Sequence, residues 1–238
     1  MVCGLAFGCQ GFATAARTAE TCVDSSGCGS GSDRRERVLL YIESDLSVMT
    51  QIGNTLPAAT AGGLLAWIGG YLSTYLVVAP NVRDSGLNRL IEALDGEPAT
   101  YELVGWVFYN AHLVDVVIED IPLIGTQSTS YIGGEDGFTV LLYLVPVALL
   151  FAVGLAAARY WQVDTPTEGA SLGALLMPGY LLATVAGVLV VEVSVGSATG
   201  GPDLLAAVVL AGIVYPLVCG GLGGAVGGLL EARNRSEP

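Results

Sequence analysis

Four long apolar stretches without a charged residue dominate the sequence and restrict what the chain can fold into. Each has about 20 residues or more, the length that an α-helix needs to cross roughly 30 Å of hydrocarbon. They lie at residues 56–78, 138–158, 172–191 and 204–230. Apolar and polar residues do not alternate in them as they do in the strands of a membrane β-barrel. The sequence therefore predicts an all-α fold, a polytopic transmembrane helix bundle.

The positions of the arginines predict a further crossing. Arginine and lysine collect on the cytoplasmic side of membrane helices, whereas acids hardly affect orientation. Two arginines lie in the loop 79–102, and none lies in the acidic loop 119–137. Along the rest of the chain, loops with arginine and loops without it continue to alternate if 103–118 also spans the membrane. We therefore expect about five spans with the C-terminus inside, the second span being the shortest.

Charge excludes one class of partner. Only 13% of the residues are charged, and 22 acids face nine basic residues, all arginine. A soluble domain carries roughly 25% charged residues. Binding to nucleic acid requires a positive surface, so nucleic acid is not an expected partner. Arginine without lysine among many acids is typical of halophilic archaea, whose acidic surfaces stay soluble in concentrated salt.

The first 48 residues differ from the rest of the chain. They hold four of the five cysteines and no long apolar run. The spacing C-x5-C-x12-C-x5-C is wider than common zinc motifs, so no metal site is expected. Met49 opens a short uncharged lead into the first apolar stretch. We interpret 1–48 as a disordered extension or a misassigned start, and 49–238 as the transmembrane domain.

One apolar run contains several strongly polar groups. Residues 105–117 read "GWVFYNAHLVDVV" and include the only histidine of the chain. On a helix, Tyr109, His112 and Asp115 would form one stripe, with Asn110 beside it. The stripe could line a polar path or ligand site, in which His112 titrates near neutral pH. Alternatively, Asn110 and His112 make interhelical hydrogen bonds that fix the packing.

Two further features extend this hypothesis. Glu192, just after the fourth span, is expected on the same outer side as Asp115 and is a candidate for the same site. In the last span, Gly220, Gly224 and Gly228 recur every four residues. Small residues at this spacing allow helix backbones to approach closely. This glycine face is expected to pack inside the bundle, or against a membrane-protein partner or a second copy.

The segments "WIGGYLSTYL" (67–76), "GWVFYNAHLVDVV" (105–117), "LLYLVPVALL" (141–150) and "MPGYLLATVAG" (177–187) occur in this order. The chain from 56 to 230 thereby resembles a family of small integral membrane proteins from haloarchaea without an established function, sometimes labelled transporters. The resemblance implies a plasma-membrane location.

The sequence predicts a small transporter, channel or permeation accessory in the plasma membrane, with the polar stripe lining its path. The alternative is a non-transporting scaffold or subunit that packs through the glycine-rich last span. The catalytic motifs of serine hydrolases, aspartic proteases and HExxH metalloproteases do not occur, so we expect no enzyme activity. We also expect no cofactor. The expected partners are the lipid bilayer and a membrane protein or second copy.

Overall fold

The structure, a computed structural model, describes residues 31–121, 125–133, 137–196 and 198–236. Its contacts divide the chain into two units, Met1–Met49 and Thr50–Pro238. Of the predicted extension 1–48, residues 1–30 lie outside the described residues. Residues 31–48 belong to helix α1 (Gly31–Arg83).

Four helical segments are long and apolar enough to cross a membrane. They coincide with the four apolar stretches of the sequence, which confirms that part of the predicted fold. The chain therefore has the composition of a membrane protein. The segments are Thr55–Arg83 in α1, Val140–Tyr160, Pro166–Val190 and Leu204–Ser236.

Three of these segments are composites of shorter helices. The second joins the 3-10 helix η1 (Val140–Tyr143) to α4 (Leu144–Tyr160). The third contains α5 (Pro166–Ala174) and α6 (Met177–Val190). The fourth runs through α7 (Leu204–Ala206), two π-helical stretches and α8 (Gly221–Ser236). The π-helices are η2 (Ala207–Val214) and η3 (Pro216–Gly220).

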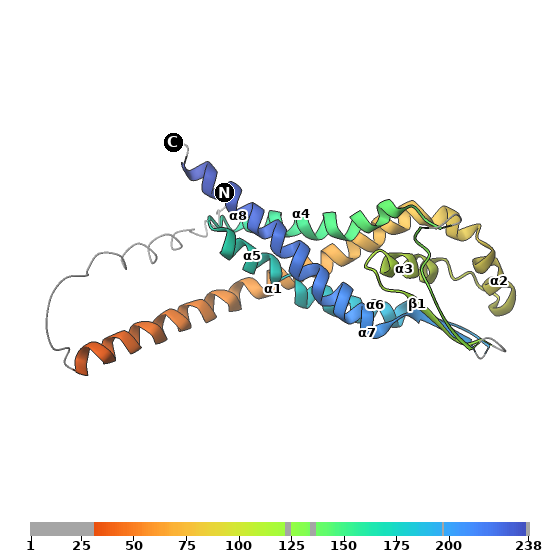
Figure 1. Cartoon of the computed structure of the whole chain (residues 1–238), viewed down its shortest axis with the longest axis horizontal. Coiled ribbons are helices and arrows are strands. Elements are labelled where there is room, and N and C mark those ends of the chain that lie inside the picture. The colour runs from red at the N-terminus through yellow and green to blue at the C-terminus, as the bar shows by residue number, and fades with distance from the viewer. Residues whose placement is uncertain (1–30, 122–124, 134–136, 197, 237–238) are drawn as a thin grey trace, which may run out of the picture. The chain divides into compact units, whose positions relative to one another are not determined.

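The four segments alternate in direction. The start of the first segment, Thr55–Arg83, lies beside the end of α4, where one shallow pocket is lined by Ala58, Ala157 and Trp161. The end of α8 lies beside the start of α5, where Arg235 forms an ion pair with Asp164 at 2.6 Å (Figure 1). We call this the arginine end. The opposite end, where the loops 84–139 and 191–203 connect the helices, is the sheet end.

A four-stranded sheet lies at the sheet end, in the order β2-β1-β4-β3. It is antiparallel throughout: β1 pairs with β2 on one side and β4 on the other, and β4 also pairs with β3. The prediction of an all-α fold was therefore wrong in this region. Two loops that are distant in the sequence meet here and satisfy each other's backbone groups. The strands are β1 (Val116–Ile121), β2 (Gly125–Thr129), β3 (Val193–Val195) and β4 (Ala198–Pro202).

Helix α2 (Gly86–Asp95) connects α1 to the buried region that follows it. The Ser85 side chain caps its first turn by accepting from the Asn88 N–H. Gly96 ends it with a φ of 87°, a left-handed conformation that glycine adopts without a steric penalty.

The predicted span 103–118 is not one helix, and this expectation was wrong. Helix α3 (Thr100–Asn110) has 11 residues, and β1 begins at Val116. Eleven residues rise only about 16 Å, half of the hydrocarbon thickness. The chain turns at Leu113, whose φ is 61°. It then leaves as a strand paired in the sheet.

The glycine face of α8 packs inside the bundle. A β-carbon at Gly224 would collide with the Gly169 backbone carbonyl of α5, and one at Gly228 would collide with that of Thr165. Just before α8, a β-carbon at Gly220 would lie 2.7 Å from the Gly173 carbonyl oxygen. Backbones this close leave no room for a methyl group. In this structure the surface of Gly220, Gly224 and Gly228 is therefore occupied by the chain's own helices.

We expect Gly224→Ala to lower the free energy of unfolding by about 1–3 kcal/mol, because the added methyl group forces α8 away from α5. Thermal unfolding in detergent measures this effect. Gly69→Ala is the matched control, since nothing lies within 4 Å of a β-carbon there. Alanine favours a helix over glycine, so the control should unfold at the wild-type temperature or above. An unchanged Gly224→Ala variant would contradict the close contact.

Candidate functional site: the polar groups at the end of helix α3

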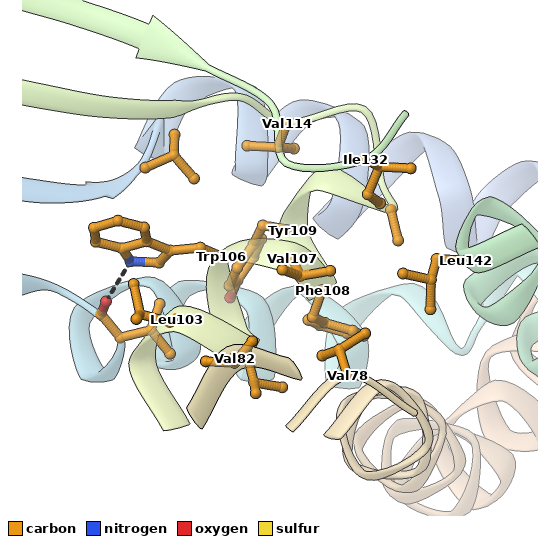
Figure 2. Packing of buried hydrophobic residues seen from close by; sticks show 14 of the residues in the cluster. Val78, Val82, Leu103, Trp106, Val107, Phe108, Tyr109, Val114, Ile132 and Leu142 are labelled. Atoms are coloured by element: carbon orange, nitrogen blue, oxygen red, sulfur yellow. Dashed lines mark hydrogen bonds between the residues drawn. The ribbon is translucent and has the colours of Figure 1, made fainter. Parts of the chain in front are cut away.

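Helix α3 and the turn after it form the most deeply enclosed part of the described chain. Every residue from Leu103 to Asn110 is buried. The side chains of α3 form the centre of the main hydrophobic cluster, together with Val78 and Val82 of α1 (Figure 2). By contrast, the long helices expose many large apolar side chains, such as Leu65 and Leu76 of α1. Such exposed leucines suit contact with lipid, whereas α3 contacts mainly protein.

Three hydrogen bonds show how α3 penetrates between the long helices. The Trp106 indole nitrogen donates to the Val191 carbonyl at 2.8 Å (Figure 2). The Tyr109 hydroxyl donates to the Thr184 carbonyl at 2.6 Å, and His112 contacts the Tyr180 hydroxyl at 2.7 Å. Going along the chain from Trp106 to His112, the partner residue changes from 191 to 180. The contact point therefore shifts by 11 residues toward the start of α6, or about 16 Å of helix rise. Because β1 then returns to the sheet end, we call 100–116 the re-entrant segment.

A helix that ends in apolar surroundings leaves its last four carbonyls without partners unless other donors reach them. For α3 these are the carbonyls of residues 107–110. Three of them accept from backbone N–H groups of residues 111–114. The fourth, that of Phe108, accepts from the His112 ring nitrogen Nδ1 at 2.9 Å. His112 therefore caps the C-terminus of α3.

The turn itself has three more carbonyls that accept hydrogen bonds from the protein. One donor is a tyrosine hydroxyl of the fourth span, one is the Asn110 amide and one is a backbone N–H. The Asn110 amide oxygen in turn accepts from the Tyr131 N–H at 2.8 Å. The three pairs are Tyr215 Oη to Ala111 O at 3.4 Å, Asn110 Nδ2 to Val114 O at 2.7 Å, and Asp203 N to Asp115 O at 3.0 Å.

The contacts of His112 determine its tautomer. A carbonyl oxygen can only accept, so Nδ1 must carry the proton that bonds to Phe108. Nε2 is then the acceptor for the Tyr180 hydroxyl. The ring is fully buried and lies edge to face with Phe108, at a centroid distance of 4.7 Å. Both nitrogens of the neutral ring therefore take part in hydrogen bonds with protein groups.

Burial also keeps this ring uncharged. His112 lies outside the four long segments, and desolvation lowers its pKa from 6.5 to about 4, although the Phe108 carbonyl acts in the opposite direction. The sequence-based hypothesis of a group that titrates near neutral pH is therefore not supported by its surroundings. His112 connects α3 to α6, as the interhelical hydrogen-bonding alternative proposed.

The remaining predicted site residues are not brought together with His112. Asp115 is exposed, follows the turn and accepts from the Ser128 hydroxyl at 3.3 Å. Glu192 is also exposed but lines a different pocket, beside Glu119. The predicted stripe of Tyr109, His112 and Asp115 fails because α3 ends at Asn110. Among the described residues, no group of three His, Cys, Asp or Glu side chains could hold a metal ion.

Sequence reasoning missed the partners of this cluster. Tyr180 and Tyr215 contact His112 from the third and fourth spans, with ring centroids 5.9 and 5.0 Å away. Both tyrosines stand within long apolar stretches, and their hydroxyl groups were the signal available in the sequence. Nothing local connects them to a histidine 68 or more residues away.

Residues 47–231 match a family of unknown function, DUF7978. The chain belongs to this family. The DUF7978 match includes the four long helical segments up to residue 231, the re-entrant segment, the sheet and every site residue predicted from the sequence. Comparison with curated proteins and with solved structures gave no match.

Because the chain has a single histidine, isotope labelling of histidine gives one ring signal that reports only on His112. We expect its nitrogen shifts to show a neutral ring protonated on Nδ1, unchanged from pH 8 down to about 5. The reason is the burial that lowers its pKa to about 4. A midpoint near the ordinary 6.5, or a proton on Nε2, would contradict the capping arrangement.

Proposed function

We propose that this DUF7978 protein is a non-transporting membrane subunit that binds a partner or ligand through its sheet end. The observation that carries the proposal is the pairing of both His112 ring nitrogens with protein groups. Tyr109, Asn110 and His112, which were expected to line a polar path, instead make hydrogen bonds that hold the re-entrant segment. The exposed carboxylates lie at the sheet end, where Asp115 and Glu192 remain accessible.

The glycine-rich last span is not the proposed binding surface. Its glycines contact α5 and the turn before it, so a partner helix would have to displace the chain's own helices. The proposal therefore keeps the scaffold or subunit role expected from the sequence but assigns it to the sheet end. We also propose that the protein has no catalytic activity, on the basis of the missing catalytic motifs.

We infer that the sheet end faces outward and the C-terminus lies inside. With four crossings, Arg159, Arg233 and Arg235 share the arginine end. The positive-inside rule then favours the cytoplasm for this side, although Arg83 and Arg89 lie toward the sheet end. The acidic composition without lysine supports the plasma membrane of a salt-adapted archaeon.

A small transporter is the second candidate function. The observation that favours it is the π-helical stretch Ala207–Val214 in the fourth span, because π-helical turns are frequent at functional sites. The Tyr215 N–H bonds the Leu210 carbonyl across this stretch, and Pro216, next to it, has no N–H to donate. A wide, imperfect helix of this kind could change shape during transport.

Flux measurements separate the two candidates. We expect liposomes containing the wild-type protein to pass protons, sodium and potassium no faster than empty liposomes at high salt. His112→Asn should behave identically, since an asparagine amide can still donate to the Phe108 carbonyl while the titratable ring is removed. Wild-type flux that disappears in His112→Asn would contradict the proposal and restore the polar path. In native membranes, cross-linking should give a complex of defined, larger mass.

A further inference from the structure

A groove at the sheet end lies between the re-entrant segment and the fourth span. Its volume is about 490 Å³, and it is open to the surroundings. One wall is the turn and the start of β1, and the other is the outer part of α7 and η2. The lining of the groove includes Leu113, Asp115, Ser128, Asp203, Leu205 and Val209.

The polar part of the groove is acidic. Asp115 and Asp203 come from different elements, and the Asp203 N–H donates to the Asp115 carbonyl at 3.0 Å, which holds the two residues together. Each carboxylate has one oxygen in a protein hydrogen bond: Asp115 with the Ser128 hydroxyl, and Asp203 with the Ala206 N–H. The lining includes no arginine. This part of the groove therefore favours a positive group.

The remaining lining is apolar and extends along the fourth span. Asp203 caps α7 at the outer end, and Leu205 and Val209 follow further along the helix, 74% and 43% exposed. Across the groove, Leu113 is 61% exposed and has a φ of 61°, so a strained turn presents its apolar side chain to the groove. The lining of the groove thus changes from acidic to apolar in the direction in which the fourth span enters the membrane.

We propose that this groove binds a cationic amphiphile, with an ammonium group between Asp115 and Asp203 and a hydrocarbon chain along Leu113, Leu205 and Val209. The hydrocarbon chain replaces water or lipid on exposed apolar surface, which is favourable in proportion to the area covered. The two carboxylates repel the head of an anionic lipid and attract an ammonium. The proposal concerns a ligand site and does not depend on whether the protein transports anything.

Photolabelling tests this proposal directly. The probe is a dodecyltrimethylammonium analogue with a diazirine in its alkyl chain, added to the full-length protein in uncharged nanodiscs. We expect labels to concentrate at Leu113 and in 204–210, as mapped by mass spectrometry. A dodecyl sulfate analogue with the same diazirine should label these positions at least roughly fivefold less, because only the head charge differs. This comparison needs no variant of the protein.

Variants identify the groups responsible. Asp115→Asn with Asp203→Asn removes both charges but keeps a hydrogen-bond acceptor at each position, and asparagine is a good helix N-cap. We expect labelling by the cation to fall to the level of the sulfate analogue. Glu192→Gln is the control: Glu192 does not line the groove but lines a neighbouring pocket that shares Asp203 with it, so labelling should stay much closer to wild type than in the double variant. Equal labelling by cation and sulfate in wild type, or undiminished labelling in the double variant, would overturn the proposal.

Discussion

The rest of the structure depends on satisfying the backbone carbonyls where α3 ends. A chain that stops being helical in apolar surroundings must find other donors, because an unpaired carbonyl there costs several kcal/mol. The polar residues of "GWVFYNAHLVDVV" meet this need. His112 caps the Phe108 carbonyl and Asn110 caps that of Val114. Their presence in an apolar run is therefore explained by backbone geometry, without a transported ion.

This constraint links the helices to the sheet. The tip of the re-entrant segment needs Tyr180 and Tyr215 as partners, so both the third and the fourth span must reach it. The returning chain becomes β1, whose edges are then satisfied by β2 and β4. At the arginine end, close packing of glycine backbones brings α8 against α5. Both ends of the bundle are thus fixed by contacts between backbones.

How much could be predicted from the sequence depends on the range of the interactions. The four long segments follow from apolar length alone, and the sequence placed them correctly. The segment 103–118 was wrongly predicted to be a span because its apolar composition suits a membrane. That α3 has only 11 residues and that Leu113 has a left-handed conformation depend on contacts with distant parts of the chain. The sheet pairs residue 117 with 201, and no local pattern specifies such a partner. Similarly, Glu192 shares a side with Asp115 but lines another pocket.

The central claim is that 100–116 enters and leaves the bundle at the same end. Cysteine labelling in intact cells tests it most directly, with Glu97→Cys before α3 and Thr126→Cys after β1, in a chain whose five native cysteines are replaced by serine. Both positions are exposed, and both should react with a membrane-impermeant reagent added outside. Thr167→Cys, at the arginine end, should react only after the cells are broken open. Labelling of positions 97 and 126 from opposite sides would make 103–118 a true span and contradict the account.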